Sequence, residues 1–385
     1  MAETRIRRWY APMVARDSGE RYRAATPLEL LFDLCFVVAV ARAAAQLHVD
    51  LSAGRLGLAV GNYVMVFFAI WWAWMNFTWF ASAYDTDDGV YRLTTLVQLA
   101  GVLVLAAGVT RAAGQADFRV VTAGYVIMRC ALVAQWLRAA HGDPPRRPAA
   151  LRFAIGIAVL QVGWVCRLAL PHGTGWAVAS FVVLGAGELA VPVWAERAAR
   201  TPWHPEHIVE RYGLFTLIVL GESILAATTA IQSALDHHLA GTLLLAGTGL
   251  VIVFALWWKY FDRSAAGQLT SLPRGIIWGY GHYLVFASAA ALGAGLTVAA
   301  DRIAGESAVS GRVAGYAVAV PTAVYLLSVW ALHWERPRGG LARWAVPVAV
   351  VVILAAPLGP APLPLIALVA AGLVALSAVR APAHR

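Results

Sequence analysis

Residues 56–80 read LGLAVGNYVMVFFAIWWAWMNFTWF, twenty-five residues without one Asp, Glu, Lys or Arg. A helix of this length is longer than the roughly 30 Å hydrocarbon core of a bilayer. Similar apolar blocks recur along the chain, separated by short connections that carry arginine. This pattern predicts a membrane protein that crosses the bilayer many times.

The composition agrees with that prediction. Of the 385 residues, 60% are hydrophobic and only 13% are charged, whereas soluble domains carry about 25% charged residues. An ordinary soluble enzyme, a disordered chain and a disulfide scaffold are excluded. A net charge of +9 would suggest nucleic-acid binding in a soluble protein, but the sequence holds no nucleic-acid-reading motif. The predicted partner is the lipid bilayer. We expect the cysteines within apolar blocks to be small buried hydrophobic residues: Cys35, Cys130 and Cys166.

The predicted fold class is all-α, a polytopic membrane bundle of about twelve helices. Placing the N-terminus in the cytoplasm assigns about 22 basic residues to cytoplasmic segments and about 6 to external loops, as the positive-inside rule requires. Both termini are therefore predicted to be cytoplasmic. The predicted spans are 27–48, 56–80, 92–110, 118–137, 153–171, 175–195, 208–232, 239–258, 275–300, 313–332, 341–358 and 362–379.

An internal repeat is also predicted, because residues 68–76 resemble residues 254–262 at an offset of 186. Two six-helix halves would then run in the same direction through the membrane. The alternative is coincidence among apolar segments. The predicted organisation is a cytoplasmic N-terminal segment at 1–26, a first half at 27–200 and a second half at 201–385.

Ionisable residues in the predicted spans are few, and the predicted topology places nearly all of them in the cytoplasmic half. Such groups are costly in a membrane and usually face a cavity or a partner. Glu29 and Asp33 lie one helical turn apart, and we expect them to face His207, Glu210 and Arg211 at the start of the seventh span. The sequence predicts a proton or solute site from these residues and from Asn76, Glu222, Asp262 and His282, with Asp85, Asp88, Arg129, Glu188 and Tyr260 as secondary candidates.

Glu222 is predicted to bind and release a proton. It follows Arg211 by eleven residues in the same predicted helix, hence by about 16 Å along the axis and about 20° around it. At that depth, desolvation favours a protonated carboxyl unless a cation pairs with it. Arg129 is a candidate counter-charge, and the alternative is that backbone carbonyls and Gln135 satisfy this arginine.

A metal site is a second interpretation of the same residues, because carboxylates and imidazoles bind transition metals. The candidate ligands are His207, Glu210, Glu29 and Asp33. Helical bundles build such sites from Glu-x-x-His, whereas this chain has the reversed order once, at His207 and Glu210. No recognised motif requires a cofactor. The acidic stretch from Asp85 to Asp88 is also explained as a solvated cap of the third span.

Three motifs together resemble the bacterial low temperature requirement A family: PLELLFDLCFV at 27–37, the WMNFT and YDTDD stretches within 74–88, and HIVERYGLFTLIVLGES at 207–223. The resemblance covers about residues 25–335. It implies a bacterial integral membrane protein, connected by name with growth in the cold, and it implies no particular biochemical activity. The matching positions are Glu29, Phe32, Asp33, Asn76, Asp85, Asp88, His207, Glu210, Arg211, Gly221, Glu222, Tyr260, Phe261, Asp262 and His282.

Two functional hypotheses follow. The first is a proton-linked carrier or permeation pathway for a small polar or ionic solute in the bacterial cytoplasmic membrane. The alternative is an intramembrane enzyme, metal-dependent or not, that acts on a lipid or other apolar substrate. A scaffold or sensor is a third, non-catalytic interpretation. The sequence indicates neither the solute nor the oligomeric state.

Overall fold

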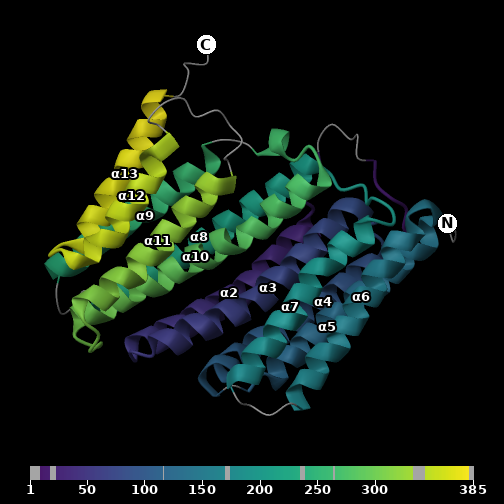
Figure 1. Ribbon diagram of the computed structural model, residues 1–385, viewed down its shortest axis with the longest axis horizontal. Helices are drawn as coiled ribbons and strands as arrows, with labels where there is room; N and C mark the ends of the chain where they lie inside the picture. The colour runs from purple at the N-terminus through teal and green to yellow at the C-terminus, as the bar shows by residue number, and fades with distance from the viewer. Residues whose placement is uncertain are drawn as a thin grey trace. The chain divides into compact units, whose positions relative to one another are not determined.

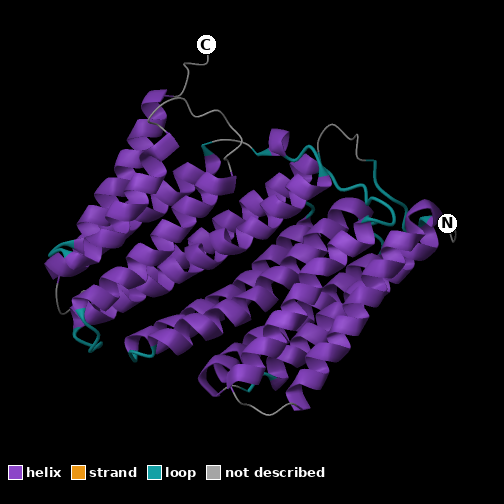
Figure 2. Cartoon of the chain, in the orientation of Figure 1, coloured by secondary structure: helices purple, strands orange, loops and turns teal. Residues whose placement is uncertain are grey.

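The computed structural model describes seven ranges of the chain: 9–17, 23–115, 117–169, 174–234, 239–262, 265–332 and 343–380. All regular secondary structure in these ranges is helical (Figure 2). The predicted all-α class is therefore confirmed for the described residues.

The long helices follow one another with short connections. In chain order they are α2 (Pro27–Ser52), α3 (Leu56–Tyr84), α4 (Gly89–Gln115), α5 (Arg119–Gly142), α6 (Arg147–Cys166), α7 (Thr174–Glu196), α8 (Pro205–Ala234), α9 (Leu239–Phe261), α10 (Leu272–Ala304), α11 (Gly311–Leu332), α12 (Ala345–Ala355) and α13 (Pro362–Arg380). Proline starts several of them, since its fixed φ suits the first helical turn and its missing N–H is not needed there. The tight turn between α2 and α3 places Gly54 at a φ of +73°, a conformation that glycine adopts without steric cost.

Ten helical segments among the described residues are long and apolar enough to cross a membrane. They coincide with ten of the twelve predicted spans. Helix α2, at the first predicted span, is not one of the ten, and it carries the charged residues Glu29, Asp33, Arg42 and Asp50. The segment Ala345–Leu358 is apolar but shorter. A polytopic helical membrane protein is the resulting architecture.

The chain divides into two compact units. Unit 1 comprises Met1–Ala43 and Met65–Arg211. Within it, α4, α5 and α6 pack side by side (Figure 1). Helices α4 and α5 approach closely because glycines face each other: a Cβ added to Gly101 would lie only 2.8 Å from the carbonyl oxygen of Gly124. Small residues permit such close approach between membrane helices.

Unit 2 comprises Ala44–Val64 and Tyr212–Arg385. Helix α10 is its most buried helix and packs against α11, while α13 packs against α9. The tip of the α2–α3 hairpin belongs to this unit, where the hydroxyl of Tyr63 donates to the carbonyl of Ala287 at 2.6 Å. At the same tip, His48 lies 2.5 Å from Asp301. The predicted halves at 27–200 and 201–385, and their repeat relationship, stay predictions.

The cysteines differ from expectation. Cys130 and Cys166 are exposed, and Cys35 is only partly covered. The prediction of buried cysteines was wrong for the first two, because an apolar helix in a membrane directs one face outward, toward lipid, where a small apolar side chain is equally well accommodated.

Candidate functional site

Arg211 of α8 forms the most buried ion pair of unit 1. Its Nη2 donates to Oδ1 of Asp33 at 2.5 Å and its Nε donates to Oδ2 at 3.3 Å, so the guanidinium binds both carboxylate oxygens. Neither side chain is exposed. The indole N–H of Trp74, on α3, also donates to Asp33, at 2.7 Å. Three helices of one unit are thus connected through one carboxylate.

Glu29 lies one helical turn before Asp33 on α2 and contacts two arginines and one histidine. Its Oε1 lies 3.1 Å from Arg211 Nη1, 3.2 Å from His207 Nε2 and 3.5 Å from Arg23 Nη2. Its Oε2 accepts a hydrogen bond at 2.8 Å from the backbone N–H of Thr26, whose hydroxyl in turn lies 3.3 Å from the N–H of Glu29. This reciprocal pairing is a capping box, which Thr-Pro-Leu-Glu encodes at 26–29.

Arg23 extends these contacts into the loop between α3 and α4. It donates to the carbonyl of Ser82 at 2.9 Å and to the carboxylate of Asp85 at 3.1 Å. Arg16 lies 3.6 Å from the same carboxylate. We use the term "ion-pair cluster" for Arg23, Glu29, Asp33, Asp85, His207 and Arg211, all of which belong to unit 1.

Burial raises the pKa of Asp85, and the negative charge of Glu29 raises it further, against the opposing positive charges of Arg23 and Arg16. Asp88, three residues on, behaves in the opposite way. Burial would raise its pKa, but hydrogen bonds from Arg138 and from the backbone N–H groups of Tyr91 and Ala11 outweigh this effect and lower the pKa below the ordinary aspartate value. Asp85 is therefore the member of this loop better placed to accept a proton.

Asp88 has a structural role that the sequence suggested only in part. It caps α4 by accepting the N–H of Tyr91 at 2.8 Å, as expected for an acidic residue before a helix. It also accepts the N–H of Ala11 at 2.6 Å and forms an ion pair with Arg138 of α5. Asp88 thus attaches the N-terminal segment to two helices, which a solvated loop residue would not do.

Several buried polar atoms around the ion-pair cluster have no hydrogen-bond partner among the described residues. They include the hydroxyl of Tyr91, Nδ1 of His207 and one carboxylate oxygen of Glu210. The other oxygen of Glu210 accepts the N–H of Ala25 at 3.3 Å. Buried polar atoms in proteins are nearly always hydrogen-bonded, commonly to ordered water. These atoms therefore identify positions for water or a polar solute.

Sequence reasoning missed three contributors to this site: Arg23, Trp74 and Tyr91. Arg23 lies outside every predicted span, and Trp74 stands in an apolar span where nothing in the sequence distinguishes it as a partner of Asp33. Tyr91 is 1% exposed at the start of α4, and nothing in its local sequence distinguishes it. The capping box at 26–29 was the one available signal that the chain before α2 is ordered.

A second buried ion pair lies elsewhere in unit 1, between Arg129 of α5 and Glu188 of α7. Glu188 also accepts hydrogen bonds from Trp72, Tyr125 and Trp164, at 2.9, 3.1 and 3.2 Å. The counter-charge for Arg129 is thus Glu188, and neither of the two alternatives considered for this arginine was right. Its supposed partner Gln135 instead binds Gln98 and Thr94.

Three of the remaining predicted residues, Asn76, Asp262 and His282, make contacts within their own unit. Asn76 donates to the carbonyl of Trp72 on its own helix at 2.7 Å. In unit 2, Asp262 lies 3.9 Å from Lys259. His282 is fixed between the Trp278 carbonyl, 2.7 Å from Nδ1, and the Tyr260 hydroxyl, 2.9 Å from Nε2. Because a carbonyl only accepts, Nδ1 carries a proton, and Nε2 shares a hydrogen bond with the Tyr260 hydroxyl.

Glu222 is half-buried on α8 in unit 2. Among the described residues, no side chain or backbone group pairs with its carboxylate. It contrasts with Glu29, Asp33 and Glu188, each of which is bound to an arginine.

The metal interpretation gains no support from the described part of the chain, where no three His, Cys, Asp or Glu side chains come together as a metal-binding group. Of its four candidate ligands, Glu29 and Asp33 are bound to arginine. A guanidinium within 3.1 Å of a carboxylate competes directly with a cation for the same oxygens.

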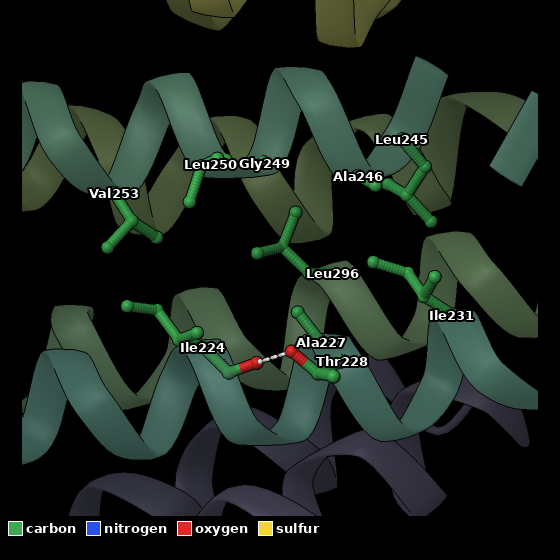
Figure 3. A pocket seen from close by; sticks show the side chains of 10 residues that line it. All are labelled: Ile224, Ala227, Thr228, Ile231, Leu245, Ala246, Gly249, Leu250, Val253 and Leu296. Atoms are coloured by element: carbon green, nitrogen blue, oxygen red, sulfur yellow. Dashed lines mark hydrogen bonds between the residues drawn. The ribbon is translucent and has the colours of Figure 1, made fainter. Parts of the chain in front are cut away.

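An apolar cavity of about 200 Å³ lies in unit 2 between α8, α9 and α10 (Figure 3). It is lined by Ile224, Ala227, Thr228, Ile231, Leu245, Ala246, Gly249, Leu250, Val253 and Leu296. Thr228 supplies the one polar side chain of this lining, and its hydroxyl donates back to the carbonyl of Ile224 at 2.8 Å. The lining of this cavity therefore contains no titratable acid or base.

Ten apolar helical segments of spanning length and charged groups buried between helices define an integral membrane protein that crosses the bilayer several times. The chain belongs to the bacterial low temperature requirement A protein (LtrA) family, whose match covers residues 24–380. It is also similar to an uncharacterized protein of Rhizobium meliloti (strain 1021), RA0937, with 28% identity over 291 residues, covering 69% of this chain and 67% of that protein. No solved structure matches the chain.

Proposed function

We propose that this protein is a proton-linked carrier or permeation pathway for a small polar or ionic solute in the bacterial cytoplasmic membrane. The observation that carries the proposal is the carboxylate of Glu222, which lies within an apolar helix of spanning length and has no partner among the described residues. An ionised carboxylate is costly there, so a group in this position alternates between a protonated form and a form paired with a cation.

The ion-pair cluster would form the gate of the pathway at the predicted cytoplasmic end. Its buried charges are matched closely enough to hold α2 and the start of α8 together, which favours a closed state. The unpartnered Tyr91 hydroxyl and His207 Nδ1 provide polar contacts for water or solute beside these charges. Asp85, with its raised pKa, would exchange protons with the cytoplasm.

The enzyme alternative is less well supported. It requires an acid–base pair beside an apolar cavity, and the apolar cavity of Figure 3 has no such pair. The ion-pair cluster contains acids and bases, but arginines bind all three of its carboxylates: Arg211 contacts Glu29 and Asp33, and Arg23 contacts Asp85.

Electrical recording from vesicles that contain the purified protein tests the proposal. The vesicles are exposed to rapid jumps of pH and of K⁺, Na⁺, NH₄⁺ and phosphate concentration. After a pH jump, vesicles with wild-type protein are expected to show a charge movement that empty vesicles do not show. The response to at least one of the solute jumps is expected to change with pH. Wild-type vesicles that respond to every jump like empty vesicles would contradict a carrier.

A further inference from the structure

A second cavity lies in unit 1 and is lined in part by Phe118. Helix α4 begins at Gly89, directly after the Asp85–Asp88 loop, and ends at Gln115, close to Phe118 in the sequence. The cavity is therefore at the end of the helices opposite to that loop. Its volume is about 40 Å³ and it is partly open. Aromatic rings from four parts of the chain form its wall: Phe68 of α3, Phe118 and Tyr125 at α5, Trp164 of α6 and Phe181 of α7. We refer to it as the aromatic pocket.

The wall of the aromatic pocket is held by ring contacts. Phe181 meets Phe68 and Trp164 edge-on, with ring centres 5.6 and 5.4 Å apart, and Trp164 meets Tyr125 at 6.3 Å. Tyr125 and Trp164 are further fixed because both donate hydrogen bonds to Glu188. The aromatic pocket is therefore preformed, which lowers the entropic cost of binding a ligand.

One charged residue, Arg167, lines the pocket. Its guanidinium lies over the ring of Phe118 at 5.1 Å, while Nε donates to the Ser180 hydroxyl at 3.1 Å and Nη2 to the Ala177 carbonyl at 3.0 Å. Among the residues that the structure describes, Nη1 has no acceptor. No carboxylate within the described ranges pairs with Arg167, although it is half-buried and a guanidinium keeps its charge. A half-buried cation without a counter-ion is a site for an anion.

The charges around the aromatic pocket argue against a cationic ligand. Aromatic cages often bind organic cations, but here Glu188, the carboxylate behind the wall, is already neutralised by Arg129. Arg167 adds a positive charge at the pocket itself, and no carboxylate of the described ranges compensates it. A cationic ligand would be repelled, whereas an anionic head group would complete the hydrogen bonding of Nη1.

We propose that the aromatic pocket binds an amphiphile with one anionic head, whose apolar body packs against the open side of the pocket, over Phe68, Trp164 and Phe181, and whose head pairs with Arg167. The head is a carboxylate or a phosphate. Such molecules have two sources here, free fatty acids and the anionic phospholipids of the bilayer. This site is independent of the proposed transport function, because it shares no residue with the ion-pair cluster.

Ligand-induced stabilisation of the purified protein in a neutral maltoside detergent tests the proposal, with dodecanoate as the probe and dodecanol as its uncharged analogue. Wild-type protein is expected to show a Tm that rises with dodecanoate and much less with dodecanol. In Arg167→Gln the apparent affinity for dodecanoate is expected to fall by about tenfold or more, as loss of a charge-assisted contact implies. In Phe181→Ala the affinity for both probes falls.

Arg152→Gln is the matched control, since Arg152 belongs to α6, the helix that ends just before Arg167, lies over the Trp194 ring at 5.3 Å and donates to a backbone carbonyl. Its affinity for dodecanoate is expected to stay within twofold of wild type. Equal losses in Arg152→Gln and Arg167→Gln, or equal responses to dodecanol and dodecanoate, would overturn the proposal.

Native mass spectrometry from nanodiscs of phosphatidylcholine with or without phosphatidylglycerol identifies the source. Retention of phosphatidylglycerol that depends on Arg167 but not on Arg152 supports the bilayer as the source of the anionic head. Dodecanoate binding without such retention supports a free fatty acid. Absence of Arg167-dependent binding of either probe would refute the site.

Discussion

Arg211 binds both carboxylate oxygens of Asp33, and neither side chain is exposed to solvent. This pair connects α8 to α2, two helices that are remote in sequence. A buried pair of this kind adds little net stability compared with apolar residues of the same shape, but removing one partner leaves an uncompensated buried charge. The pair therefore acts more as a specific connection than as a source of stability.

Replacement of Arg211 by Gln is expected to lower the free energy of unfolding by about 3–5 kcal/mol, because Asp33 and Glu29 then remain buried without their main counter-charge. The measurement is thermal unfolding of the purified protein in detergent micelles. In the double variant Asp33→Asn, Arg211→Gln, the loss in free energy of unfolding should be smaller than the sum of the losses in the two single variants. Strict additivity in this double-mutant cycle would show that the two side chains do not interact.

Replacement of Asp88 by Asn is expected to cost about 1–3 kcal/mol at neutral pH, since Asn accepts the contacts of Arg138 and Ala11 only partly. The pKa of Asp88 is lowered in the folded protein, so its stabilising contribution is complete above the ordinary aspartate pKa of about 4 and is lost as the pH falls through the lower folded value. The difference in free energy of unfolding between wild type and Asp88→Asn should therefore become smaller below about pH 4.

Asp87→Asn provides the control for this prediction. Asp87 forms an exposed ion pair with Arg92 at 2.8 Å, and such exposed pairs contribute little to stability. If both variants have the same unfolding temperature at pH 7, Asp88 has no special structural role.

Gly101→Ala is expected to destabilise unit 1 by about 1–3 kcal/mol, because the added methyl group would lie 2.8 Å from the Gly124 carbonyl and 2.7 Å from Met128. Gly114, on the same helix, has open space around it. Gly114→Ala should be neutral or stabilising by up to about 1 kcal/mol through helix propensity. Thermal unfolding of the two variants side by side measures the contrast, and equal effects would rule out close packing of α4 on α5.

The fold could be predicted from the sequence because a membrane imposes one rule on every span: about twenty apolar residues in a helix. The rule fails to predict which face of a helix meets which neighbour. Glu29 and Asp33 could be placed on one face from their spacing, and their contacts with His207 and Arg211 agree with the expected orientation. The sequence alone, however, could not exclude a different partner for each.

The Arg129 pair illustrates this limit. Any of several intramembrane carboxylates could have neutralised Arg129, and selecting Glu188 requires knowledge that α5 and α7 approach at that level. Arg23 and Tyr91 were missed for a related reason, since one lies before the first helix and the other is an unremarkable residue in a helical first turn. Arg23, for example, contacts the Ser82 carbonyl across 59 residues of sequence.

Glu222 is proposed to carry the proton. Proton flux into vesicles loaded with a pH-sensitive dye tests this claim. Glu206→Gln is the matched control, because Glu206 is an exposed carboxylate in the first turn of the same helix. With an imposed membrane potential, we expect Glu222→Gln to lose at least nine-tenths of the wild-type proton flux while Glu206→Gln retains it. Wild-type flux in a folded Glu222→Gln protein would contradict the claim.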